Sequence, residues 1–296
     1  MKKLRNRLMI LVFLIVLSFP MTVSADIGPK PSVRISFEGL EKETYYVTLI
    51  SEEDSTGPYT AGGGCPEYYT KGEAEAFAKF AEYDKGTDFY FLGYLQDCSE
   101  THEFAWTYYP PGRFRVVAYL PEYDYFLESE GISERYAFDS YFESKVSNAK
   151  NLGKENYLEA IMMKTRTSYD YKWELRSLAA RIVLTIAVEF VLALFFGYFG
   201  KKPLGIIVGT NVFTQVVLNV LLNLANYKHG HWAFVFHFIW MEIVVFVLEG
   251  LIYRTAIGKT NPRNDKPYHP WRYALAANAV SFAVGLLTAK VIPGIF

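Results

Sequence analysis

The sequence predicts an α+β multidomain membrane protein, in which an extracytoplasmic antiparallel β-sandwich of the immunoglobulin-like (Ig-like) type precedes a C-terminal bundle of four transmembrane helices. Three observations predict this fold class. The chain starts with an export signal, residues 26–150 have strand-like patterning, and four long apolar stretches follow residue 173.

Charge divides the chain in nearly the same place. Residues 26–170 contain 26 acidic and 14 basic residues, whereas residues 171–296 contain 5 acidic and 12 basic residues. Together with the four basic residues of residues 1–25, these regions give the formal net charge of −1, which therefore combines segments with different surroundings. The acidic excess of the first region argues against nucleic acid as a partner, because nucleic-acid binding needs basic patches.

Residues 1–25 have the pattern of a signal peptide. Four basic side chains precede an apolar run, Leu8–Phe19, which ends at Pro20 and is followed by the small residues Val23-Ser24-Ala25. The run is short for a membrane span, which needs about 20 apolar residues. We expect cleavage after Ala25. An uncleaved signal anchor is the alternative, and either one places the next segment outside the cytoplasm.

Residues 26–150 have mostly the pattern of strands. Six segments combine alternation with aromatic and β-branched residues: Ser32–Phe37, Thr44–Ser51, Asp88–Gln96, Arg113–Leu120, Asp124–Glu128 and Arg135–Phe142. One amphipathic helix is expected over Lys71–Tyr83, where Ala and Phe recur on one face. Short strands separated by Gly- and Pro-containing turns favour a β-sandwich.

Two features of this domain leave alternatives open. The chain has two cysteines, Cys65 and Cys98, and an exported location favours a disulfide between them over two free thiols. The many Tyr and Phe side chains form either the core of a small domain or an aromatic surface that binds a sugar or peptide. Strand alternation directs about half of such rings inward, which favours the core.

Residues 151–173 are expected to form a polar connector, and residues 174–296 a transmembrane domain. The expected spans lie near Leu178–Tyr198, Leu204–Leu224, Trp232–Tyr253 and Ala274–Ile292. Basic residues after the third span, including Arg254 and Lys259, place that loop in the cytoplasm. The sequence therefore predicts a multi-pass protein of the bacterial cell membrane with its N-terminal domain extracytoplasmic.

Polar residues inside the spans are the candidate functional residues. The predicted intramembrane polar cluster consists of Glu189, Asn211, Gln215, Asn219, Glu242, Glu249, Asn278 and Ser281. The side-chain amides of the second span, Asn211, Gln215, Asn219 and Asn223, recur every four residues, so they form one stripe on that helix. A charged group at the bilayer centre costs about 2.5–3.5 kcal/mol, so we expect the acids to face protein or water. Depth along the spans predicts that Glu189, Gln215, Glu242 and Ser281 converge.

Two interpretations of this cluster remain open. In one, the glutamates and amides form a proton or cation relay, or a polar substrate pocket. In the other, the amides join helices by hydrogen bonds, with protonated glutamates as donors. No catalytic residue, cofactor-binding residue or metal-ligand set is predicted, because no segment has a motif with the required spacing and context.

The layout resembles a group of uncharacterised bacterial membrane proteins that pair an exported β-rich domain with a four-helix membrane segment. The residues that carry the resemblance are Asp26–Ser32, Glu53–Pro58, Tyr136–Phe142, Tyr169–Leu175 and Trp240–Tyr253. The resemblance covers most of the chain. It implies this domain layout and no particular activity or catalytic residue.

Two functional hypotheses follow, with a membrane enzyme as a third. The first is a non-enzymatic envelope protein whose exported domain binds a small ligand or an envelope partner while the bundle anchors it in the lipid bilayer. The alternative is a small transporter or transporter subunit that uses the buried Glu189 and Glu242.

Overall fold

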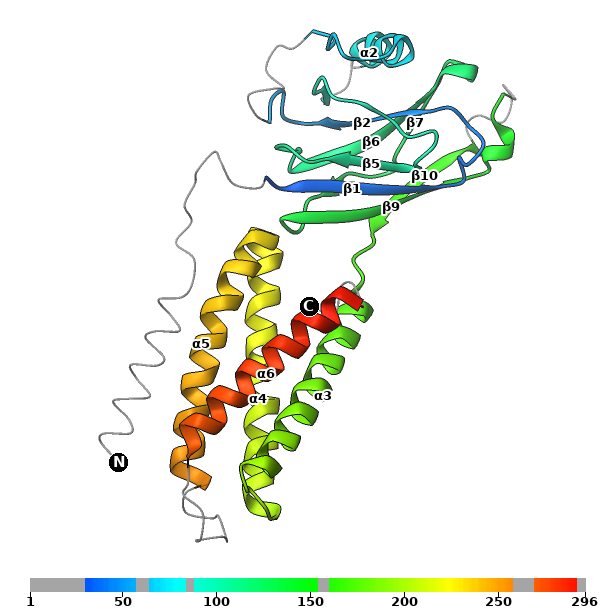
Figure 1. Cartoon of the computed structure of the whole chain (residues 1–296). Helices are drawn as coiled ribbons and strands as arrows, with labels where there is room; N and C mark the ends of the chain where they lie inside the picture. The colour runs from blue at the N-terminus through cyan, green and yellow to red at the C-terminus, as the bar shows by residue number, and fades with distance from the viewer. Residues whose placement is uncertain (1–29, 57–63, 84–87, 154–159, 258–268, 292–296) are drawn as a thin grey trace. The chain divides into compact units, whose positions relative to one another are not determined.

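The computed structural model describes residues 30–56, 64–83, 88–153, 160–257 and 269–291. The chain has mixed α and β content and divides into two compact units, one within Gly28–Tyr169 and one that contains Asp170–Phe296 (Figure 1). The predicted signal peptide and most of the expected cytoplasmic loop after the third span lie outside the described residues. The two units are described separately below.

The described residues of the first unit form two β-sheets and one α-helix. One sheet has the strand order β10-β9-β1-β5 and the other the order β3-β2-β6-β7, with β4 beside β2 and β8 beside β6. The strands of the first sheet are β1 (Ser32–Glu38), β5 (Glu103–Trp106), β9 (Asp139–Ser147) and β10 (Met162–Thr167). Those of the second are β2 (Tyr46–Ser51), β3 (Tyr90–Phe91), β4 (Gln96–Asp97), β6 (Arg113–Leu120), β7 (Tyr125–Glu128) and β8 (Ser133–Glu134).

Alternate residues of β2 face two different apolar clusters. Val47 and Leu49 belong to a core that both sheets share, whereas Tyr46 and Ile50 pack with Phe80 of helix α2 (Lys71–Tyr83). Strand β2 is therefore buried along its whole length. Burial of each large apolar side chain contributes about 1.5–3 kcal/mol, so this double contact fixes the register of β2.

Helix α2 begins where its sequence supplies a capping box. The Thr70 hydroxyl accepts from the Glu73 backbone N–H at 3.3 Å, and the Glu73 carboxylate accepts from the Thr70 backbone N–H at 2.8 Å. Both bonds satisfy backbone donors that the first helical turn leaves without a partner. The helix spans Lys71–Tyr83, the range that the apolar periodicity predicts.

Three predictions for this unit need correction. The expected strand over residues 88–96 is two short strands, β3 and β4, because Gly93 adopts a positive φ of 72° between them. Strand β1 pairs with β9 in parallel, so the first sheet is mixed rather than antiparallel. Strand β10 lies in the predicted connector and pairs with β9, so the β unit extends beyond residue 150.

The predicted disulfide is also wrong for this structure, in which Cys65 and Cys98 are both free. Cys98 is fully buried in the shared core, whereas Cys65 is exposed. Burial raises the pKa of the Cys98 thiol, since the thiolate loses its hydration there. An exported compartment permits a disulfide, but it does not place two thiols next to each other.

The described residues of the second unit form four long helices, drawn in Figure 1: α3 (Tyr171–Phe195), α4 (Lys201–His229), α5 (His231–Ala256) and α6 (Pro270–Val291). Each helix packs mainly against two others, in the cyclic order α3-α4-α5-α6. Asp170 caps α3 by accepting from the backbone N–H groups of Lys172 and Trp173. Gly230, at a φ of 82°, allows the tight turn between α4 and α5.

Among the described residues, three helices are long and apolar enough to cross a membrane: α3, α4 and α5, with 25, 29 and 26 residues. Their outward faces carry exposed apolar side chains such as Val183, Phe213 and Ile239, which are 67%, 59% and 57% exposed. Such a surface is unfavourable in water and favourable in lipid. These features are those of a membrane protein.

Candidate functional site

One group of polar contacts in the helical unit surrounds Glu189 of α3. Its carboxylate Oε2 accepts from Asn211 Nδ2 of α4 at 2.5 Å and from the Tyr253 hydroxyl of α5 at 3.3 Å. The Tyr273 hydroxyl of α6 donates to the Glu189 backbone carbonyl at 3.1 Å. All four residues are buried, so side chains from all four helices meet at this glutamate.

A second buried carboxylate, Glu249 of α5, joins the same network. Its Oε1 accepts from the Thr214 hydroxyl of α4 at 2.8 Å, and its Oε2 accepts from Asn278 Nδ2 of α6 at 2.7 Å. The Thr214 hydroxyl also lies 3.2 Å from the backbone carbonyl of Asn211, so the groups around the two carboxylates adjoin each other. We call this group the acid cluster; its members are Glu189, Asn211, Thr214, Glu249, Tyr253, Tyr273 and Asn278.

Helical spacing explains why these side chains lie together. Asn211 and Thr214 are three residues apart on α4, and Glu249 and Tyr253 are four apart on α5, so each pair lies on one helix face. Within the described part of the chain, amides and hydroxyls are the only hydrogen-bond donors to the two carboxylates. The cluster is therefore polar without containing an ion pair among those residues.

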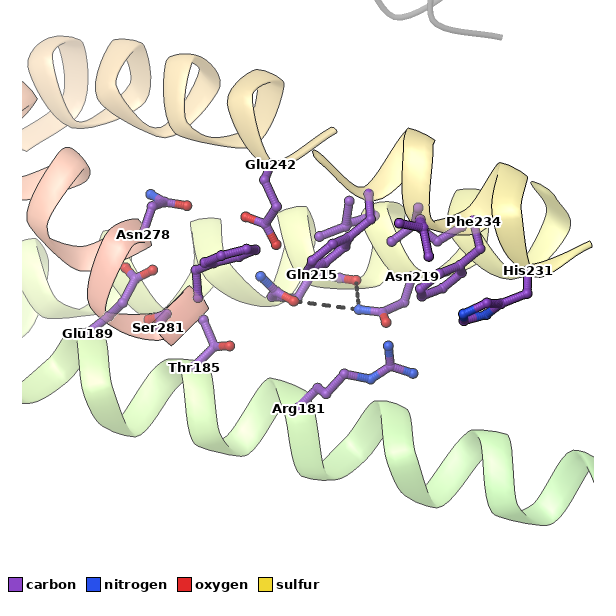
Figure 2. Close-up of a pocket in the computed structure, with 15 residues that line it drawn as sticks. Arg181, Thr185, Glu189, Gln215, Asn219, His231, Phe234, Glu242, Asn278 and Ser281 are labelled. Carbon is purple, nitrogen blue, oxygen red and sulfur yellow. Dashed lines mark hydrogen bonds between the residues drawn. The ribbon is translucent and has the colours of Figure 1, made fainter. Parts of the chain in front are cut away.

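A cavity of about 250 Å³ lies between the helices next to the acid cluster. All four helices contribute polar side chains to its lining: Arg181, Thr185 and Glu189 from α3, Gln215 and Asn219 from α4, His231 and Glu242 from α5, and Asn278 and Ser281 from α6. Figure 2 shows Glu242 and Arg181 extending from opposite sides toward the α4 amides. The remaining lining is apolar, with rings from Phe234, Phe238 and Phe282.

Glu242 differs from the two glutamates of the acid cluster. It is partly buried, and no hydrogen bond or ion pair to its carboxylate is found among the described residues. Nearby, Asn219 Nδ2 donates to the Gln215 backbone carbonyl at 2.7 Å and lies 3.5 Å from Gln215 Oε1, so these two amides contact each other. The carboxylate of Glu242 is thus available to a molecule inside the cavity.

No family model, no curated protein and no solved structure matches this chain. The resemblance to uncharacterised bacterial membrane proteins stays a prediction. The geometry of the helical unit is therefore the basis of the proposed function.

The structure distributes the predicted cluster residues over two adjoining places. Asn211 and Glu249 belong to the acid cluster alone, and Gln215, Asn219, Glu242 and Ser281 line the cavity alone. Glu189 and Asn278 take part in both, so they join the acid cluster to the cavity. The four residues expected at similar depth, Glu189, Gln215, Glu242 and Ser281, all line the cavity.

Sequence reasoning missed several polar residues of this region, among them Arg181, Thr214, Tyr253 and Tyr273. Arg181 had the clearest signal, because an arginine inside an apolar span is as costly as an acid and faces protein or water for the same reason. Thr214 and the two tyrosines gave no such signal, since threonine and tyrosine are common in membrane helices. Their role follows only from the rotation of each helix about its axis.

Proposed function

We propose that the helical unit is a small transporter or transporter subunit that binds a small polar solute in its interior cavity. One observation carries the proposal: carboxylates, an arginine and amides from all four helices line a cavity inside a bundle of mainly apolar helices. Charged groups inside membrane helices are rare and typically mark a pathway or a binding site. The acid cluster next to the cavity adds a place for a proton or a cation that moves with the solute.

The proposal includes α6 as a fourth span. With 22 residues, α6 has a length of about 33 Å, which is enough for a hydrocarbon core of about 30 Å. We further propose that the β unit lies outside the cytoplasm of a bacterial cell. Arg254 and Arg272 then lie at the cytoplasmic ends of α5 and α6, as the positive-inside rule requires.

For the β unit we propose an Ig-like β-sandwich arrangement, supported by the apolar core that both of its sheets share. The hypothesis that this unit binds an extracytoplasmic ligand or partner stays a prediction. Many of its rings, such as Phe104, Trp106 and Phe114, are buried in that core, which weakens the interpretation of an aromatic binding surface. The polar cavity of the bundle is therefore the better supported site.

Thiol labelling tests whether water reaches the cavity. A cysteine at Ser281, on the cavity wall, is compared with a cysteine at Val280, which is 40% exposed on the outward face of the same helix. Both variants carry Cys65→Ser, and the parent without the new cysteine measures any residual labelling of the buried Cys98. The probe is a membrane-impermeant methanethiosulfonate ammonium reagent, applied to the protein in proteoliposomes.

We expect Ser281→Cys to react at least about tenfold faster than Val280→Cys, because a thiolate forms only where water reaches the sulfur. We also expect Glu242→Gln to abolish transport without abolishing folding. Equal, slow labelling of both cysteines would show a dry bundle that serves as an anchor only, and would overturn the proposal.

A further inference from the structure

The charges that line the cavity define the class of molecule that it accepts. We infer that the cavity binds a small zwitterion with an apolar body, of the amino-acid class, with its ammonium group at Glu242 and its carboxylate at Arg181. This inference rests on the proposed function, since it assigns a ligand to the same cavity.

Arg181 supplies the positive charge. Its side chain is only 8% exposed, and its Nε–H donates to the backbone carbonyl of Ser177 one turn earlier at 3.4 Å. Figure 2 shows the terminal nitrogens directed from α3 toward Asn219, on the cavity side of the helix. A guanidinium group matches a carboxylate because it donates two parallel hydrogen bonds.

Glu242 supplies the negative charge from the opposite side of the cavity. Figure 2 shows its carboxylate directed from α5 toward Gln215, and the described residues provide no donor to it. An ammonium group carries three donors and a compact charge, so it suits a carboxylate that lacks protein partners. The other carboxylate in the lining, Glu189, already accepts from Asn211 and Tyr253.

The space between the two charges sets the remaining features of the ligand. The volume of about 250 Å³ lies below the usual range of about 300–1,000 Å³ for ligand pockets, so the ligand is small. Phe234, Phe238 and Phe282 form an apolar wall that suits an apolar body. The Ser281 hydroxyl is buried without a hydrogen-bond partner among the described residues, and it faces the same space.

Singly charged ligands fit this lining less well. A simple cation at Glu242 adds a positive charge near Arg181, and a simple anion at Arg181 adds a negative charge near Glu242. In a site of low dielectric constant either arrangement is unfavourable, whereas a zwitterion complements both groups. His231, at the first residue of α5, is the remaining titratable group in the lining.

Protection of Ser281→Cys from the methanethiosulfonate reagent tests the inference. The zwitterionic probes are glycine, leucine and phenylalanine, which have the same charged groups and increasing apolar bodies. The matched controls are 3-methylbutylamine and 4-methylpentanoate, which keep the leucine body with only the ammonium or only the carboxylate. We expect at least one zwitterion to slow labelling about tenfold at saturation, while each half-molecule at the same concentration slows it less than about twofold.

Variants then assign the two ends of the ligand. Glu242→Gln and Arg181→Gln should each reduce the affinity of the zwitterion about tenfold or more, whereas Arg181→Lys should retain part of it. Arg176→Gln, at an exposed position on α3, should leave protection unchanged. Gel filtration and circular dichroism show which variants fold. If a variant does not fold, the comparison of zwitterions with half-molecules still tests the inference, because it uses a protein in which Arg181 and Glu242 are unchanged.

Two failures are distinguishable. If Ser281→Cys reacts but no zwitterion protects it, or if a half-molecule protects as well as leucine, the ligand assignment is wrong and the solute-binding cavity stands. If Ser281→Cys does not react, both the cavity proposal and the ligand assignment fall.

Discussion

Thr214→Val offers a clean perturbation of the acid cluster, because valine keeps the shape of threonine and removes only the hydroxyl. In the structure that hydroxyl is 2.8 Å from Glu249 Oε1 and belongs to a side chain that is 3% exposed. An interhelical hydrogen bond in a membrane protein contributes about 0.6 kcal/mol on average and about 1.7 kcal/mol at most. Loss of the donor also leaves a buried carboxylate oxygen unsatisfied, which costs about 1–3 kcal/mol.

We therefore expect Thr214→Val to lower the free energy of unfolding by about 2 kcal/mol. Thr210→Val is the matched control, since Thr210 lies one turn earlier on α4 at similar burial and is hydrogen-bonded to neither carboxylate of the acid cluster. The assay is unfolding in mixed micelles by a stepwise increase in the fraction of sodium dodecyl sulfate, followed by circular dichroism. A double-mutant cycle with Glu249→Gln isolates the coupling between the two side chains.

The reasoning is refuted if Thr214→Val costs no more than Thr210→Val. A coupling energy near zero in the cycle would have the same meaning, since the two side chains would then not interact in the folded state.

Three further predictions concern packing, thiol reactivity and pH. Gly250→Ala should destabilise the bundle by about 1–3 kcal/mol, because a Cβ there collides with the indole ring of Trp271 on α6. Gly209→Ala is the control: its Cβ would lie in open space, so it should be neutral or stabilising in the same unfolding assay. Cys98 should stay unlabelled by a maleimide in the folded protein and react only after unfolding. The intact mass of the untreated chain should be that of two free thiols, without the loss of two hydrogens that a disulfide causes. Hydrogen bonds from Lys79 and a tyrosine lower the pKa of Asp124 below 3.8. The contribution of Asp124 to stability is therefore complete above pH 3.8 and is lost as the pH falls through the lowered pKa. The difference in unfolding free energy between wild type and Asp124→Asn should accordingly shrink below pH 3.8.

Local patterns predicted the elements that depend on local interactions. Helix α2 was predictable because its apolar stripe and its capping box lie within residues 70–83. Strand β6 matched its prediction, Arg113–Leu120, since it is a continuous run of β-forming residues. Strand β9 begins four residues later than predicted because the Ser140 hydroxyl accepts from the backbone N–H groups of Tyr136 and Ala137, which form a turn before it.

Elements that depend on distant partners were not predictable in the same way. Strand β10 has the exposed pattern of an edge strand, and it is a strand only because β9 supplies its partner over residues 142–147. The free cysteines are a second example, since no pattern in the sequence reports the distance between two side chains.

The candidate site was predictable in composition and not in arrangement. Polar residues inside apolar spans can be recognised as candidates from the sequence, because burying each in lipid costs free energy unless it faces protein or water. The rotation of each helix about its axis decides which of these residues contact one another. As a result Glu242 lines the cavity, whereas Glu249 accepts hydrogen bonds from Thr214 and Asn278. Seven residues apart, the two glutamates looked equivalent in the sequence.

A nitroxide scan of α5 tests most directly whether the polar faces of the helices enclose water rather than face lipid. Spin labels are placed singly at positions 238, 239, 242 and 243 of a Cys65→Ser protein in bilayers, and collision rates with oxygen and with a water-soluble nickel complex are measured. Positions 238 and 242 line the cavity and should favour the nickel complex, whereas positions 239 and 243, which are 57% and 49% exposed on the outside, should favour oxygen. The reverse pattern, with nickel contact highest at 239 and 243, would contradict the enclosed polar cavity.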